Sequence, residues 1–326
     1  MPNRRRFIQG AAAAALGAAG ASHGQGAWPT KSVRVINPFP AGGGTDAFLR
    51  PIAARLSQTM GQQFIVENMG GAGGTVGAAA AAKAAPDGYT LFCGAVHHTI
   101  AESLYTRLPY NIERDFIPIT VLAYVPNVLV VHPKYTEINS YADFLAYVRR
   151  NPGKLNFGSA GNGTSHHLTV ELYKQMTKTF MTHIPYRGAG PMMQDLLAGS
   201  VDFAFDGMGT SAPQIKGGKL KGLAVTSAKR VPAFPNIPTM EEVGLKGYQA
   251  TTWYALWAIK GTPQEVVTRT HQEVVKALQE PNIKELWFNQ GAELGGNTPA
   301  EFAKFITAEI EKWSKVVKAS GAKIDL

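Results

Sequence analysis

The sequence predicts an α/β protein with two lobes and a ligand cleft between them. Segments typical of strands and of helices alternate from residue 27 onward, and this order builds parallel sheets. Hydrophobic residues make up 45% of the chain and charged residues 17%, a balance that favours a globular domain over a disordered one. A flexible glycine loop between a strand and a helix occurs twice, at 39–46 and 159–165. Two such loops far apart in the sequence favour a ligand held between two lobes.

Residues 1–26 are typical of an export signal. Three arginines at positions 4–6 precede an apolar run rich in alanine, and Ala19-Gly20-Ala21 is a small-residue cleavage pattern. Residues 3–8 also fit the twin-arginine pattern. No later stretch approaches the ~20 apolar residues of a membrane span, so we expect a mature chain that is exported and not inserted in the membrane.

The charge and the single cysteine narrow the possible partners. The net charge of +9 falls to +6 once the three signal arginines are removed, and the remaining Lys and Arg residues are scattered. Because no basic run or nucleic-acid module is present, we expect no nucleic-acid partner. Cys93 lies in an apolar run and has no second cysteine to pair with, so we expect a buried structural thiol.

The first half of the chain predicts a sheet covered on both faces, because its strands are continuously apolar. Pro51 falls inside the first helical pattern, so that helix either starts late or bends. The predicted elements are strands at 33–37, 64–67 and 89–93, a helix at 48–60, and a second glycine loop at 70–77 that opens into an alanine-rich helix ending at 85.

The second half begins near Ile117 with a long apolar run at 121–131 that Pro126-Asn127 interrupts. The predicted elements after it are helices at 141–150 and 192–197, a helix that carries Leu168, Leu172 and Met176, strands at 155–158, 180–184, 201–205 and 221–226, and helices at 263–279 and 299–319. The last two helices are too few for a third domain. We therefore expect lobe I at 27–124 and 225–326, and lobe II at 125–224.

The first glycine loop is predicted to bind an anion. Three consecutive glycines allow backbone conformations closed to other residues and let a ligand approach the amides closely. Thr45 and Asp46 suit the start of a helix, whose free N–H groups and dipole favour a carboxylate or phosphate. The alternative is a turn without ligand contact. The loop at 159–165 repeats the pattern with added hydroxyl groups.

Many motifs in the right order resemble the tripartite tricarboxylate transporter substrate-binding proteins, the Bug family. The resemblance covers essentially the whole chain after residue 28. Its motifs are PFPAGGGTD (38–46), EN (67–68), GAGG (71–74), DGYTL (87–91), PNVLV (126–130), NPGKL (151–155), GSAGNGTS (158–165), DLLAG (195–199), AVTS (224–227), GTP (261–263) and TPAEF (298–302).

This resemblance implies a periplasmic solute-binding protein of type II, with two Rossmann-like lobes joined by two crossing strands. We expect the crossings near residues 123–128 and 223–226. Such a protein captures a small carboxylate-bearing ligand for the membrane subunits of its transporter. We expect a soluble periplasmic monomer that is not an enzyme and needs no cofactor.

The resemblance also implies that backbone amides and hydroxyls of the two loops hold the carboxylate. Asp206 matches a family aspartate at the cleft, although a cap on the following turn is an equal alternative. His97 and His166 fall where family members differ, so we expect specificity residues there. The predicted ligand-binding residues are Phe39, Ala41, Gly42, Gly44, Thr45, Asp46, His97, Ser159, Gly161, Asn162, Gly163, Thr164, Ser165, His166 and Asp206.

Two alternatives concern the cleft. A metal site at the histidine pairs 97–98 and 166–167 is disfavoured, because helix neighbours point apart and no further ligand lies at suitable spacing. Trp253, Tyr254 and Trp257 either wall a pocket for an aromatic acid or belong to the core. The sequence leaves dicarboxylates, tricarboxylates, amino acids and aromatic acids open as ligands.

Two enzyme classes are alternatives to a binding role, and the sequence disfavours both. The run 42–47 fits a dinucleotide fingerprint, but residues 38–41 separate it from the strand and Asp46 would repel a pyrophosphate. An exported hydrolase would use Ser159 or Ser165 near His166, but no nucleophile elbow is present.

Overall fold

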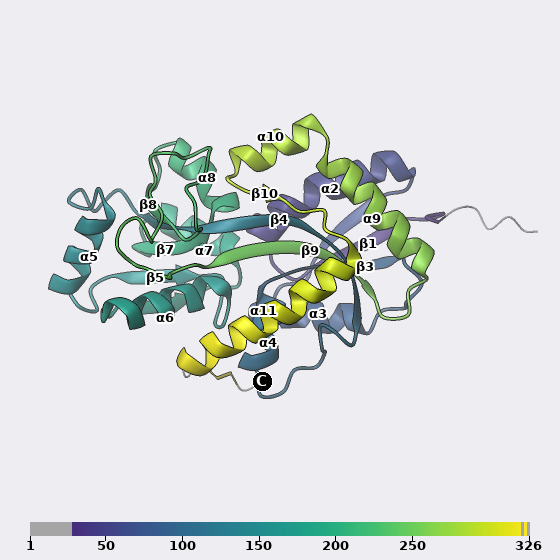
Figure 1. The fold of residues 1–326 in the computed structure, drawn as a ribbon, viewed down its shortest axis with the longest axis horizontal. Helices are drawn as coiled ribbons and strands as arrows, with labels where there is room; N and C mark the ends of the chain where they lie inside the picture. The colour runs from purple at the N-terminus through teal and green to yellow at the C-terminus, as the bar shows by residue number, and fades with distance from the viewer. Residues whose placement is uncertain (1–27, 321–322, 325–326) are drawn as a thin grey trace, which may run out of the picture.

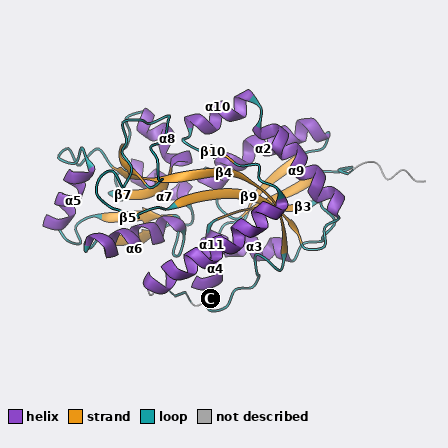
Figure 2. Cartoon of the chain, viewed as in Figure 1, coloured by secondary structure: helices purple, strands orange, loops and turns teal. Residues whose placement is uncertain are grey.

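The computed structural model describes residues 28–320 and 323–324 and has helices on both sides of a long curled sheet (Figures 1 and 2). The strand order is β2-β1-β3-β9-β4-β7-β5-β6, and β8 and β10 also pair with β4. Within the described residues, no helix combines the length and apolarity needed to cross a membrane. The predicted export signal at 1–26 lies outside the described residues.

The first lobe is a sheet with helices on both faces, as its continuous apolar strands predicted. Parallel strands β1 (Val33–Asn37), β2 (Phe64–Asn68) and β3 (Thr90–Ala95) are joined by antiparallel β9 (Thr251–Ile259) and by β10 (Glu293–Leu294) on β4. One face carries α2 (Gly44–Met60), α9 (Gln264–Leu278) and α10 (Pro281–Asn289). The other carries η1 (Ala72–Gly74), α3 (Thr75–Ala82), α4 (His97–Leu104) and α11 (Pro299–Ser320).

The second lobe repeats this layout on a smaller scale. Strand β5 (Asn156–Ser159) is parallel to β6 (Thr182–Pro185) and β7 (Phe203–Gly207), while β8 (Lys221–Val225) runs antiparallel to β4. Residues of α5 (Tyr141–Arg150) and α6 (Ser165–Thr177) share one hydrophobic cluster. Residues of α7 (Ala189–Leu197) and α8 (Met208–Lys216) join the cluster that also contains α2.

Strand β4 (Phe116–Val131) crosses between the lobes as one element (Figure 1). Pro126-Asn127, which interrupts the apolar run of the sequence, does not break the strand, and the strand passes through the expected crossing region at 123–128. β4 pairs with β9 up to Pro126 and with β7 from Asn127 onward, so proline stands where the strand changes partners. A missing N–H is tolerated there because no continuous ladder depends on it.

Helix α2 begins at Gly44, which excludes the late start that Pro51 suggested. Proline lies inside the helix and removes one of its hydrogen bonds. Helices α4, α8 and α10 were not assigned from the sequence. α8 contains Gly209 and Pro213, which lower its helix propensity, so its packing against the sheet decides the conformation.

The return to the first lobe runs through residues 226–250. Met240 and Tyr248 pack in the hydrophobic cluster that contains Phe144 and Phe203 of the second lobe. The lobe boundaries stay a proposal, but this packing favours a return crossing near residue 250 over one near residue 225.

Candidate functional site

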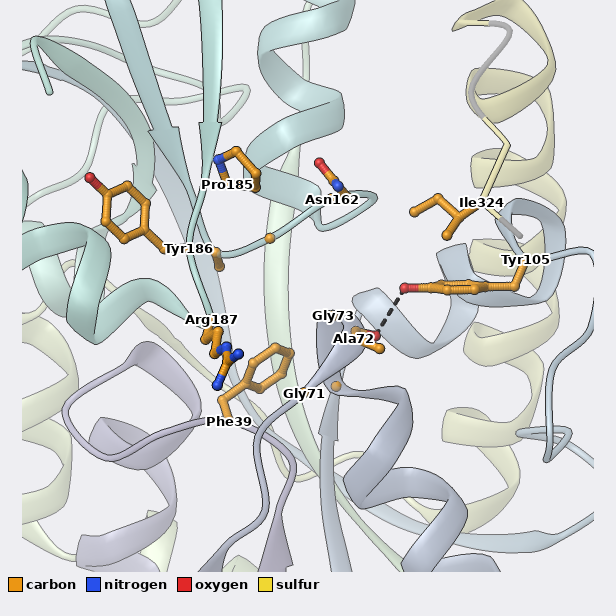
Figure 3. Close-up of a pocket in the computed structure, with 13 residues that line it drawn as sticks. Phe39, Gly71, Ala72, Gly73, Tyr105, Asn162, Pro185, Tyr186, Arg187 and Ile324 are labelled. Atoms are coloured by element: carbon orange, nitrogen blue, oxygen red, sulfur yellow. Dashed lines mark hydrogen bonds between the residues drawn. The ribbon is translucent and has the colours of Figure 1, made fainter. Parts of the chain in front are cut away.

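A pocket of about 270 Å³ lies between the loops of the two lobes (Figure 3). It forms at the carboxyl ends of parallel strands, where α/β proteins commonly bind ligands. Phe39, residues 71–74 and Tyr105 contribute from the first lobe, residues 160–162 and 185–187 from the second, and Ile324 from the C-terminal segment. The Tyr105 hydroxyl donates a hydrogen bond to the Ala72 carbonyl at 2.9 Å, which braces one wall.

Asp46 holds the first loop in shape. Its Oδ2 accepts hydrogen bonds from Gly42 N at 3.1 Å and Arg50 Nε at 2.7 Å, and its Oδ1 accepts from the amides of Asn37 and Asn68, each at 3.2 Å. Burial alone would raise the pKa of Asp46, but the bonds from Arg50, Gly42 and Asn68 outweigh it and keep the pKa low. This accounts for Asp46 by the loop's own structure, and its contact with a ligand stays a prediction.

The second loop is braced in a similar way by its own hydroxyl groups. Ser159 Oγ accepts from Gly161 N at 3.1 Å and lies 2.6 Å from His183 Nε2. The Thr164 hydroxyl donates to the Gly161 carbonyl at 2.8 Å, and Gly163 N donates to His167 Nδ1 at 3.1 Å. These bonds leave the loop preformed.

His183 was not singled out in the sequence, yet it supports this loop. Its ring stacks on His167 with centroids 4.0 Å apart. Burial, together with the nearby His167 and Lys174, lowers the pKa of His183 to about 3. A neutral imidazole beside Ser159 therefore persists over the physiological pH range.

The structure brings His97 of α4 and His166 of α6 together from the two lobes. Their ring centroids are 6.0 Å apart, and His97 also meets the Phe39 ring edge-on at 5.1 Å. Ser165 Oγ lies 3.5 Å from His97 Nδ1 and 3.1 Å from Thr252 Oγ1. Burial lowers the pKa of both histidines, so both rings are neutral at neutral pH.

Asp206 ends β7 beside this pair and is fully buried. Its Oδ2 accepts hydrogen bonds from the hydroxyls of Thr210 at 2.5 Å and Ser211 at 2.6 Å. Both donors are side-chain hydroxyls and not backbone N–H groups, so these bonds tie Asp206 to α8 without being a helix cap. Its Oδ1 lies 3.7 Å from His166 Nδ1, so the same carboxylate also faces the cleft histidine.

Only some of the predicted site residues line the pocket. Phe39, Gly161 and Asn162 do, whereas Thr45, Thr164 and Ser165 are buried at the starts of their helices. Missed in the sequence were residues 71–74, Tyr105 and the 185–187 segment. The GAGG run could have been identified as part of the binding site, because Thr75 follows it at a helix start as Thr45 follows the first loop.

The lobes touch across the cleft through glycine backbones. A Cβ atom placed on Gly190 at the start of α7 would lie 2.7 Å from the Ala41 carbonyl oxygen, and one on Gly188 would lie 2.8 Å from Pro40 Cδ. A Cβ on Gly73 would lie 3.3 Å from the Asn162 carbonyl oxygen. Glycine is therefore required where the loops of the two lobes meet.

A metal site, a reactive cysteine and a tryptophan-lined pocket have little support in the described residues. Among residues 28–320 and 323–324, no group of three or more His, Cys, Asp or Glu side chains is arranged to hold a metal ion. Cys93 is buried and free, as expected, and burial raises the pKa of its thiol. Trp253 and Trp257 pack against Phe302 of α11, which assigns them to the core.

Comparison with known proteins agrees with this architecture. The family model described as "Tripartite tricarboxylate transporter family receptor" matches residues 48–322. Protein BugT of Bordetella pertussis (strain Tohama I) is 36% identical over 299 residues, with 91% of each chain covered. A UPF0065 protein from the tcbD-tcbE intergenic region of Pseudomonas sp. (strain P51) is also 36% identical, covering 96% of this chain and 94% of its own.

Solved structures give the same result. R. palustris Rpa4515 with adipate is 38% identical with a TM-score of 0.88, covering 92% of this chain and 100% of its own. MatC from Rhodopseudomonas palustris with bound malate is 33% identical with a TM-score of 0.84, covering 89% and 100%. The periplasmic binding protein BugD is 33% identical with a TM-score of 0.88, covering 92% and 100%. The chain therefore belongs to the tripartite tricarboxylate transporter receptor family and is a solute-binding protein of the Bug type.

Proposed function

We propose that this protein captures a small carboxylate-bearing solute in its cleft and delivers it to the membrane subunits of a tripartite tricarboxylate transporter. It does so as an exported periplasmic monomer. The bound solutes of two relatives, adipate and malate, are both dicarboxylates and support this ligand class.

The observation that carries the proposal is the convergence of helix starts on the cleft. Helices α2 and α6 begin in the two glycine loops, and α7 begins at Gly188, which contacts Pro40 across the cleft. None of their N-cap residues makes a side-chain cap hydrogen bond. The positive ends of three helix dipoles without side-chain caps therefore lie near the junction of the lobes, and an anion held between the lobes would be stabilised there.

Within this proposal, the fifteen residues predicted from the sequence and the 71–74 loop form the ligand-binding region. Direct contacts come from the amides of the loops and from the Thr45 hydroxyl, while Asp46, Ser159 and Thr164 hold those loops in place. The family match and its relatives fit a binding protein better than an exported hydrolase. Incubation with carboxylic esters tests the hydrolase alternative, and ester turnover that His183→Phe abolishes would support it.

A thermal-shift screen against a library of carboxylic acids tests the proposal. A ligand at ~100 times its dissociation constant stabilises the folded state by ~2.7 kcal/mol, which is a readily measured shift. Calorimetry then gives the affinity. Failure of every di-, tri-, amino and aromatic acid in the library to stabilise the protein would contradict the carboxylate assignment.

Export is tested by the intact mass of the secreted protein. The pattern Ala19-Gly20-Ala21 predicts cleavage after Ala21. A membrane-bound product that retains residues 1–21 would contradict release into the periplasm.

A further inference from the structure

Three polar atoms at the base of the cleft are buried and have no hydrogen-bond partner within the described residues. They are Nδ1 and Nε2 of His166 and Oδ1 of Asp206. His166 is 2% exposed and Asp206 is 0% exposed. An unpaired buried polar group is costly, and a bound ligand that pairs with these three neighbouring atoms would remove that cost.

Asp206 fixes which nitrogen of His166 carries the proton. Its Oδ2 already accepts from Thr210 and Ser211, while Oδ1 faces His166 Nδ1 at 3.7 Å. Burial lowers the pKa of His166 more than the nearby Asp206 raises it, so the ring is neutral. A neutral ring beside a carboxylate oxygen carries its proton on Nδ1, which leaves Nε2 as a hydrogen-bond acceptor.

The free Nε2 faces the same small region as a tyrosine hydroxyl. A Cβ atom placed on Gly207 would lie 4.0 Å from His166 Nε2 and 3.6 Å from the Tyr254 hydroxyl oxygen. Burial raises the pKa of Tyr254, which keeps the hydroxyl protonated and able to donate. The same hydroxyl packs directly against Gly44 in the first turn of α2, where it leaves no room for a Cβ atom.

We propose that His166, Tyr254 and the start of α2 select acids that carry a hydrogen-bond donor next to the carboxylate, namely α-hydroxy or α-amino acids. The carboxylate accepts from α2 amides and the Tyr254 hydroxyl, and the neighbouring hydroxyl or ammonium donates to His166 Nε2. Asp206 is the positioning residue that holds His166 in the accepting tautomer. This inference rests on the proposed function and adds the substrate class.

An acid without such a donor is bound more weakly for a physical reason. Such an acid either leaves Nε2 of His166 unpaired or places one of its own carboxylate oxygens against the Nε2 lone pair. Both arrangements lower its affinity. We expect a ten- to hundredfold preference for the donor-bearing acid of a matched pair.

Calorimetry with pairs that differ by one hydroxyl measures this preference. The pairs are succinate and malate, adipate and 2-hydroxyadipate, and 3-phenylpropanoate and 3-phenyllactate. Wild-type protein should bind the hydroxy acid of at least one pair ten- to hundredfold more tightly. His166→Phe keeps an aromatic ring but removes Nε2, so it should bring the two affinities of that pair within about threefold.

Two further variants separate the roles of the neighbours. Gly207→Ala is sterically permitted, because the Gly207 φ is −65° and the added Cβ would make ordinary contacts. It should weaken binding of the hydroxy acid more than binding of the matched acid that lacks the hydroxyl. Asp206→Asn should reduce the preference without removing it, since the Nδ1 proton is no longer fixed. His132→Phe, just after the end of β4, is the matched histidine control and should keep the full preference.

The outcomes separate this inference from the proposed function. Equal wild-type affinities within every pair that binds would overturn the inference and leave carboxylate binding intact. A preference that His166→Phe retains in full would also overturn it. Failure of all six acids to bind, with an unchanged melting temperature, would count against both.

Discussion

Two buried aspartates at the cleft differ in what they hold. Asp46 binds backbone and side chains of its own loop, whereas Asp206 binds two hydroxyls of α8 and faces a histidine. Sequence reasoning predicted both as ligand-binding residues, since an acid after a strand gives no sign of its partners. Long-range neighbours such as Asn68 and His166 decide the role, and they are set only by the fold.

The lowered pKa of Asp46 gives a pH-dependent stability. A carboxyl with a lowered folded-state pKa stabilises the protein above its unfolded pKa, near 3.8, and this stability is lost as the pH falls through the folded value. Asp46→Asn should cost about 1.5–3 kcal/mol of unfolding free energy at pH 7, because it removes the charge that strengthens the hydrogen bonds from Arg50, Gly42 and Asn68. Urea unfolding at pH 7, 5 and 3 should show the difference shrinking toward pH 3. A difference that stays constant would contradict the assigned role.

Arg187 is an exposed cation at the pocket, and replacing it tests whether a salt bridge contributes to carboxylate binding (Figure 3). If backbone amides hold the carboxylate, Arg187→Ala should cost at most about 1 kcal/mol, and less at high salt. Thr45→Ala, at the start of α2, should cost about 1.5–3 kcal/mol of binding free energy, because it removes a hydroxyl that is predicted to donate to the carboxylate. Arg150→Ala, on the exposed end of α5, is the matched control. Calorimetry showing lost binding in Arg187→Ala with Thr45→Ala near wild type would establish a salt-bridge site instead.

At the scale of elements, local signals predicted some helices well and others not at all. Helix α5 has the predicted bounds, because Ser140 accepts a hydrogen bond from Asp143 N and provides a cap. Helix α4 begins at two histidines and has no side-chain cap, so nothing in the sequence marked it. The sequence did not show that the crossing strand changes partners between Pro126 and Asn127, because that change is a tertiary feature.

The start of α7 should control closure. Gly190→Ala would place a Cβ 2.7 Å from the Ala41 carbonyl oxygen, although the α7 backbone itself accepts alanine. Separating the loops by this added atom should cost about 1–3 kcal/mol of ligand binding, or roughly five- to a hundredfold in affinity. Gln194→Ala, exposed on the same helix, is the control. Unchanged affinity in Gly190→Ala would show that this contact is not part of the ligand-bound state.

At the scale of the whole molecule, one strand and one long connection join the lobes. β4 spans both sheets, and residues 226–250 return beside it. Thr226 N donates to the Asn127 carbonyl at 2.9 Å, and Asn127 N donates to Thr226 Oγ1 at 3.0 Å. Such paired connections permit hinge bending. The moving surfaces include one hydrophobic cluster shared by the lobes, which contains Phe48 of α2 and Met192 of α7. The two-lobed fold was predictable because many short motifs resemble one family. The direct contacts between the loops of the two lobes were not predictable from these motifs.

Small-angle scattering tests the hinge. The radius of gyration should fall when a saturating acid is added to wild-type protein, and it should fall less for Gly190→Ala. A tight ligand that leaves the wild-type value unchanged would mean that the free protein is already closed in solution.

The glycine contacts between the loops also bear on how fast a solute enters. A molecule can reach the cleft only while the lobes are apart, so the association rate constant is the encounter rate multiplied by the fraction of open protein. Alanine at position 190 disfavours the closed form through its contact with Ala41, so it should raise this fraction. Stopped-flow mixing should then show faster association together with much faster release. We therefore expect Gly190→Ala to lower the equilibrium affinity for the solute while it raises the association rate constant.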